Sequence, residues 1–175
     1  MPKILLDFYH FECRIFKEVN RHFDKKILNL FFRSITHIGG AVFTIISTIL
    51  LILFSTDQTK LTAISSAFAL AISHLPVQFV KKLFPRKRPY LTIEKTNVPS
   101  NPLKDHSFPS GHTTAIFSVI IPFVLFLPSL SFILIPLGIF IGLSRIYLGL
   151  HYPSDVMAGG LLGTSIGACC FFLIG

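Results

Sequence analysis

The sequence predicts an all-α protein: an integral membrane helical bundle of about five transmembrane helices, with an N-terminal amphipathic helix at the membrane interface. Three observations lead to this class. Hydrophobic residues make up 51% of the 175 residues. They gather in stretches of about 20 residues, the length that crosses a hydrocarbon core. Short polar segments separate these stretches, and a water-soluble domain of this size could not bury so much apolar surface.

Residues 1–34 are predicted to form the amphipathic helix, ahead of a transmembrane domain over residues 35–175. Charges recur too often within residues 4–32 for a membrane span. Apolar residues such as Phe11 and Ile15 nevertheless recur there at helical spacing. The helix would lie in the interface with its apolar face toward the acyl chains, or pack on the ends of the other helices; the two arrangements are compatible.

Five apolar stretches follow and are predicted to cross the membrane. They are residues 35–54, 61–80, 112–127, 130–148 and 156–174. If these spans alternate in direction, the N-terminal helix and the two polar segments 81–111 and 145–155 reach the same membrane surface. A site could therefore be assembled there from distant parts of the sequence.

Small residues mark one face of the last stretch. Gly159, Gly163 and Gly167 lie four residues apart, a spacing that lets helix backbones approach closely. This face would serve packing inside the bundle or in a dimer.

The net charge of +8 is confined to a few segments, which points to lipid headgroups or a phosphate site rather than to nucleic acid. The three cysteines include no CxxC pair, so neither a disulfide framework nor a zinc site is indicated. The N-terminus lacks the apolar core of a signal peptide, and we expect none.

The first polar motif is KKLFPRKRPY. Lys81 ends a span, and Pro89 favours an extended Arg88 close to it. An arginine fork suits bidentate contact with phosphate, and lysine adds a point charge. Taken alone, the cluster also fits a basic segment that touches lipid headgroups.

The second motif is SFPSGH, residues 107–112. Ser110 is placed as a helix N-cap, and Gly111 leaves the backbone open to a ligand. The free N–H groups of the following helix suit an anion, with His112 within reach of it. A simple helix cap with a surface histidine would account for the same residues.

The third motif is SRIYLGLHYPSD, residues 144–155. Arg145 ends one span, and Asp155 begins the next, one helical step from His151. A carboxylate there can accept from one imidazole nitrogen and keep the other as a free lone pair. That arrangement favours histidine as a nucleophile. Helix capping would explain Asp155, but not the presence of Arg145 and His151 beside it.

Together the motifs supply cations, helix amides and two histidines, the groups that phosphoryl transfer without a metal requires. The chain resembles the type 2 phosphatidic acid phosphatase (PAP2) superfamily, in its membrane lipid phosphatase branch. The motifs of that family are KxxxxxxRP, PSGH and SRxxxxxHxxxD, and every signature position is matched within residues 81–155.

The resemblance implies roles for individual residues. His151 would be the nucleophile that forms a phosphohistidine, Asp155 would orient it, and His112 would be the general acid. The phosphate would be held by Lys81, Arg88, Ser110, Gly111 and Arg145. No metal and no other cofactor is expected. The implied substrate is a phosphorylated membrane lipid: phosphatidate, phosphatidylglycerophosphate, an isoprenyl pyrophosphate such as undecaprenyl pyrophosphate, or lipid A.

Two other functions fit parts of the sequence. A metal-dependent membrane hydrolase could use His106, His112, His151, Asp105 and Asp155, although the neighbouring cations would repel a metal. An anion transporter subunit could use the basic cluster as a mouth, although the span interiors carry almost no ionisable groups. A vanadate-dependent peroxidase is disfavoured because those relatives are soluble.

The expected location is a bacterial cell membrane, with several passes through it. Nearly all basic residues lie on the side of the motifs, and Lys60 lies opposite. The positive-inside rule would place that side in the cytoplasm. The resemblance implies the outer face instead, and that is the side we expect, because several of these cations serve the site.

Overall fold

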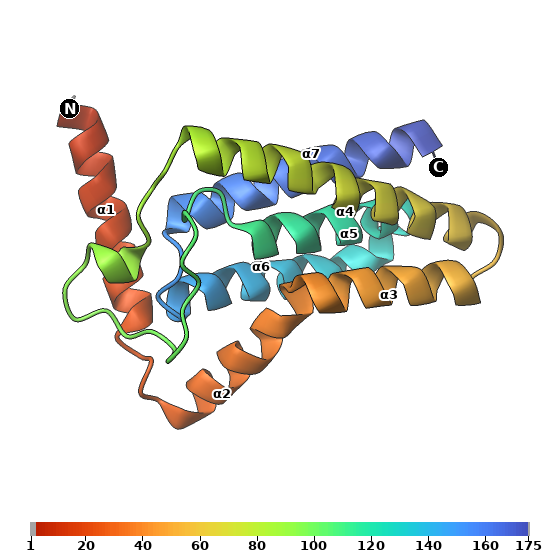
Figure 1. The fold of residues 1–175 in the computed structure, drawn as a ribbon. Coiled ribbons are helices and arrows are strands. Elements are labelled where there is room, and N and C mark those ends of the chain that lie inside the picture. The colour runs from red at the N-terminus through yellow and green to blue at the C-terminus, as the bar shows by residue number, and fades with distance from the viewer. Residues whose placement is uncertain (1–2, 175) are drawn as a thin grey trace.

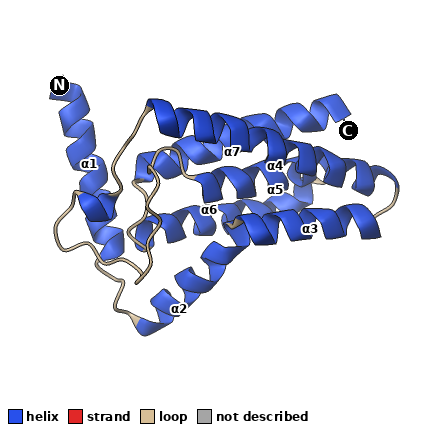
Figure 2. Cartoon of the chain, in the orientation of Figure 1, coloured by secondary structure: helices blue, strands red, loops and turns tan. Residues whose placement is uncertain are grey.

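Each of the five apolar stretches contains an α-helix in the computed structural model, which describes residues 3–174. The five helices are α3 (Ala41–Phe54), α4 (Asp57–Leu83), α5 (Gly111–Phe126), α6 (Ser131–Tyr147) and α7 (Pro153–Ile174). In the predicted stretch 35–54, this helix begins only at Ala41. The described part of the chain contains no strand, and Figure 2 shows helices joined by loops. The predicted all-α class, a helical membrane bundle, is confirmed.

Among the described residues, three helical segments are long and apolar enough to cross a membrane: α4, α7, and α6 with the turn before it. A fourth candidate is the pair Lys26–Gly39 and Ala41–Phe54, which is bent by 55°. Helix α5 is apolar but has 16 residues. The number of spans therefore stays a prediction.

The N-terminal segment forms two helices, so the prediction of one continuous helix over residues 4–32 was wrong at its centre. Helix α1 (Lys3–Asn20) and helix α2 (Lys26–Ile35) are separated by a turn. Side-chain hydrogen bonds hold this turn: Asn29 Nδ2 donates to the Phe23 carbonyl at 2.7 Å, and the distant Tyr147 hydroxyl donates to the His22 carbonyl at 2.8 Å. These contacts replace the helical bonds that would have continued α1.

Helix α1 is amphipathic, as predicted, and lies across the end of the bundle (Figure 1). One face packs against α6 and α7 and buries Glu12, Phe16 and Asn20. Beside this face, large apolar side chains such as Phe8 and Phe11 are exposed. Packing on the helix ends and an exposed apolar face thus occur together in one helix.

The small-residue face of α7 packs against α5 of the same chain. A Cβ atom at Gly163 would lie 2.9 Å from Phe117 Cβ and 3.0 Å from Ser118 N. A Cβ atom at Gly159 would lie 2.6 Å from the Ser110 carbonyl oxygen. Glycine therefore lets the two backbones touch, and the start of α7 lies beside the start of α5.

We expect Gly163→Ala to lower the free energy of unfolding by about 1–3 kcal/mol, because the methyl group would press into the backbone of α5. Thermal unfolding of the purified protein in detergent measures the change. Gly160→Ala is the matched control on the same helix, since its Cβ atom would meet its nearest neighbour at 3.7 Å. Equal melting temperatures for the two variants would contradict the tight contact.

Candidate active site

The three motifs meet at one end of the bundle, where α4 and α6 end and α5 and α7 begin (Figure 1). The backbone N–H of Ser110 donates to the Asp155 carbonyl at 3.0 Å, which joins the second motif to the third. The Arg88 side chain donates to the Leu150 carbonyl at 2.7 Å, which joins the first motif to the third. The three motifs therefore converge at one end of the bundle, as expected.

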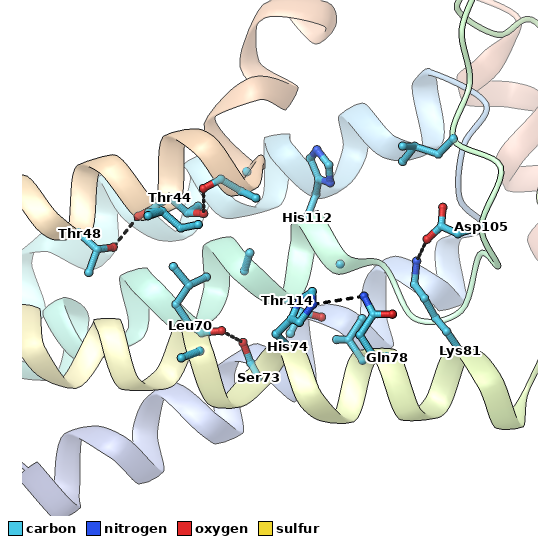
Figure 3. A pocket seen from close by; sticks show the side chains of 18 of the residues that line it. Thr44, Thr48, Leu70, Ser73, His74, Gln78, Lys81, Asp105, His112 and Thr114 are labelled. Atoms are coloured by element: carbon cyan, nitrogen blue, oxygen red, sulfur yellow. Dashed lines mark hydrogen bonds and ion pairs between the residues drawn. The ribbon is translucent and has the colours of Figure 1, made fainter.

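Arg88 and Lys81 both bind the Asp105 side chain. Arg88 is extended (φ −71°, ψ 153°), as the following proline predicts, and is 1% exposed. Its Nη2 donates to Asp105 Oδ1 at 2.7 Å, and Lys81 Nζ donates to Asp105 Oδ2 (Figure 3). Burial favours a raised pKa for Asp105, but the contacts with Lys81 and Arg88 outweigh it and lower the pKa to about 2. The carboxylate is therefore ionised and lies between two of the predicted phosphate-binding cations.

His151 lies between α6 and α7 and is 1% exposed. Its Nε2 is 3.1 Å from Arg88 Nη1. A guanidinium can only donate, so Nε2 must accept, which puts the ring proton on Nδ1. Burial, followed by the charges of Arg145 and Arg88, lowers the pKa of His151 well below its ordinary value. The imidazole is therefore neutral near pH 7, with a lone pair on Nε2.

Asp155 faces the other nitrogen of that ring. Its Oδ2 lies 3.6 Å from His151 Nδ1, which is longer than a hydrogen bond. Oδ2 accepts the Tyr152 N–H at 2.8 Å. The predicted partner is in place, but the contact is looser than the direct acceptance that the sequence suggested.

Arg145 is 3% exposed, and its Nη1 donates to Thr36 Oγ1 at 2.7 Å. Its Nε and Nη2 have no hydrogen-bond partner among residues 3–174. A buried guanidinium with two unpartnered donors is unfavourable unless an anion accepts from them. Arg145 is therefore suited to hold a negatively charged group.

The start of α5 adds backbone donors. Ser110 is the N-cap residue, as predicted, but its hydroxyl contacts Thr113 Oγ1 at 2.9 Å and makes no capping bond to the backbone. The first amides of α5 are thus not taken by that side chain, and a helix N-terminus attracts anions. His112 lies in the first turn of α5. Its ring is close to Gly40, since a Cβ atom placed on Gly40 would lie 3.7 Å from His112 Nε2.

A cavity of about 690 Å³ extends from this cluster between α3, α4 and α5. Lys81, Arg88, His112 and His151 line its polar end. Figure 3 shows His112 and Lys81 at one part of the cavity and Leu70 and Thr48 further along it. The deeper walls are otherwise apolar, apart from Thr44, Thr48, Ser73, Thr114 and the pair of His74 and Gln78. The Nε2 atoms of His74 and Gln78 are 3.3 Å apart. The shape suits a molecule with a charged head and an apolar tail.

Sequence reasoning missed two polar neighbours of the site. Asp105 entered the prediction as a candidate metal ligand and not as the partner of Lys81 and Arg88. Arg86 stands in the first motif at a position that the family pattern leaves open, and it binds Asp155. A basic residue two places before Arg88 was the available signal.

Among residues 3–174, no three His, Cys, Asp or Glu side chains are grouped to hold a metal ion.

Comparisons with known proteins agree with these observations. The family model described as the PAP2 superfamily matches residues 62–174. The bacitracin transport permease protein BcrC of Bacillus licheniformis is 32% identical over 108 residues, which cover 62% of this chain and 53% of that protein. An undecaprenyl-diphosphatase of Sulfolobus acidocaldarius is 30% identical over 120 residues, which cover 68% of this chain and 57% of that protein.

The chain spans about half the length of the curated relatives it matches. Among solved structures, LpxE of Aquifex aeolicus superposes with a TM-score of 0.82 at 27% sequence identity. The match covers 91% of this chain and 93% of that chain.

Proposed function

The chain belongs to the PAP2 superfamily, and from that premise we propose that it hydrolyses a phosphomonoester or pyrophosphate bond of a membrane lipid. The observation that carries the proposal is the buried guanidinium of Arg145, whose two unpartnered donors lie in a cluster with Arg88 and the neutral His151. Arg88 and His151 of this cluster line the polar end of a largely apolar cavity.

The phosphate would bind among the cations. Arg145, Arg88 and Lys81 would neutralise its oxygens, together with the first amides of α5 at Ser110 and Gly111. The substrate would replace the Asp105 carboxylate as the anion between Lys81 and Arg88. Dense positive charge is what this reaction requires, since uncatalysed phosphate monoester hydrolysis is among the slowest reactions known.

Chemistry would then proceed in two steps without a metal. The lone pair of His151 Nε2 attacks phosphorus, the bond from phosphorus to the lipid-side oxygen breaks, and His112 donates a proton to that oxygen. Asp155 stabilises the positive charge that develops on the imidazole. Water then attacks phosphorus and His112 takes a proton from the water. The bond from phosphorus to His151 Nε2 breaks, and inorganic phosphate leaves.

The lipid chain would begin in the apolar part of the cavity between α3 and α4. Undecaprenyl pyrophosphate is the first candidate, because one relative is named an undecaprenyl-diphosphatase. Phosphatidylglycerophosphate and phosphatidate are the other candidates.

The proposed location is a bacterial cell membrane with the site on the outer face. A cysteine placed at Asn97, in a chain without its native cysteines, should then react with an impermeant thiol reagent on intact cells.

A panel of these lipid phosphates, assayed side by side with purified protein in detergent and EDTA, tests the function. We expect phosphate release from at least one of them in the presence of the chelator. Loss of activity with EDTA, restored by one divalent metal, would favour a metal-dependent hydrolase instead. Anion flux through liposomes that contain the His151→Ala protein would favour the transport role that the name of the Bacillus relative carries.

Asp105→Asn is expected to tighten the binding of inorganic phosphate by about three- to tenfold, because an ionised carboxylate no longer competes for Lys81 and Arg88. Product inhibition of lipid hydrolysis measures the change. Asp57→Asn is the control, since it removes the same charge from the opposite end of α4. Weaker phosphate binding by Asp105→Asn would show instead that Asp105 holds the two cations in position.

A further inference from the structure

Arg86 links the N-terminal helix to the carboxylate beside His151. Its Nη1 donates to Asp155 Oδ1 and to Ser154 Oγ, both at 2.8 Å. Its Nη2 forms an ion pair with Glu12. The guanidinium carbon also lies 3.8 Å from the centre of the Tyr152 ring. Arg86 is therefore held from three directions and has little freedom to move.

Glu12 comes from the middle of α1 and is 4% exposed. Its Oε1 binds Arg86, and its Oε2 accepts from the hydroxyl and the backbone N–H of Ser154. Both oxygens are thus committed to residues next to Asp155, and neither faces the phosphate-binding cations. A buried carboxylate is unfavourable unless it is paired in this way.

This arrangement has two consequences for His151. First, Arg86 binds Oδ1 of Asp155, which leaves Oδ2 as the oxygen that faces His151 Nδ1. Second, the charges of Glu12, Arg86 and Asp155 sum to one negative charge. Without Glu12, the charge of Arg86 would offset that of Asp155, and the group would have no net negative charge to stabilise a positive imidazole.

We propose that Glu12 and Arg86 are positioning residues for the nucleophile: Arg86 sets the orientation of Asp155, and Glu12 neutralises Arg86 so that the negative charge of Asp155 acts on His151. This inference rests on the proposed function, because it takes His151 as the nucleophile. The other charged or titratable groups around His151 are Arg88 and Lys81 from the first motif, His112 from α5 and Arg145 from α6. Glu12 contacts none of these four by a hydrogen bond or ion pair.

Glu12→Gln tests the proposal, because glutamine keeps the size of the side chain and one acceptor oxygen but removes the charge. We expect kcat to fall about tenfold with KM little changed, since a positive imidazole loses one stabilising charge. In the pH dependence of kcat, the acid limb should move to lower pH by about half a unit or more, because His151 becomes harder to protonate. Glu12→Asp, which restores the charge, should return the limb toward that of the unmodified protein.

Glu18→Gln is the matched control, because it removes the same charge from the exposed side of α1, where Glu18 pairs with Arg21. It should leave kcat and the acid limb unchanged. A fall in kcat for Glu12→Gln without movement of the acid limb would indicate a purely structural role and overturn the proposal. Unchanged kcat and pH dependence would overturn it too, while lipid hydrolysis by the unmodified protein would leave the proposed function standing. If the unmodified protein hydrolyses none of the lipid phosphates, both fail.

Discussion

His151→Asn is expected to reduce phosphate release from the lipid substrate by about 10⁴-fold, the scale seen when a catalytic nucleophile is removed. The reason is specific to one atom. Nε2 of His151 carries a lone pair next to Arg88, in a neutral ring. Asparagine can still donate toward Asp155, so the variant removes the attacking nitrogen and disturbs its surroundings little.

Single-turnover assays on the preferred lipid measure this loss. An alkali-stable phosphoprotein should also form when the unmodified protein is quenched during turnover, and it should be absent in the variant. His106→Asn is the matched control, because His106 is an exposed histidine of the same polar surface. It should retain nearly full activity, whereas a metal-dependent hydrolase that uses His106 would lose it. Substantial turnover by His151→Asn would contradict the phosphohistidine route.

Arg145→Met is expected to reduce activity strongly and to stabilise the protein in the absence of phosphate. The rate should fall about 10³-fold, because a donor to the transition-state oxygens is lost. The free energy of unfolding should rise by about 1–3 kcal/mol, because an apolar side chain replaces a buried charge with two unpartnered donors. A loss of activity together with a gain in stability would indicate that Arg145 serves to bind the ligand rather than to stabilise the fold.

Lipid hydrolysis measures the loss of activity, and thermal unfolding with and without inorganic phosphate measures the change in stability and the binding of phosphate. Phosphate should raise the melting temperature of the unmodified protein and leave that of the variant unchanged. Arg14→Met, on the exposed face of α1, controls for the loss of one arginine. A melting temperature for Arg145→Met below that of the unmodified protein would contradict the view that the guanidinium is unfavourable in the free protein.

Much of the fold could be predicted from local sequence, because apolar stretches of span length leave few alternatives to helices. The start of α5 was also readable, since Ser110 is a typical residue at a helix beginning. The turn between α1 and α2 was not, because hydrogen bonds from Asn29 and Tyr147 impose it. Tyr147 is more than 120 residues away in the chain.

The candidate site divides in the same way. Motif spacing located the residues that surround the phosphate site, and the structure brings them together at one end of the bundle. Spacing says nothing about which charges pair, since Glu12, Arg86 and Asp155 come from three distant segments. The contacts of Asp105 with Lys81 and Arg88 were missed for the same reason: they depend on the path of the loop between α4 and α5.

The close contact between α5 and α7, which their glycines allow, bears on how proteins of this family acquire new substrates. His112 belongs to α5, and His151 and Asp155 stand at the start of α7. Because these two helices pack closely, the proposed acid and nucleophile keep fixed positions relative to each other. Helix α3, which forms a wall of the cavity, lies outside the segment that the family model matches. Mutation could therefore remodel the lipid-facing wall freely, and lineages could acquire new lipid preferences while the reaction machinery stays unaltered.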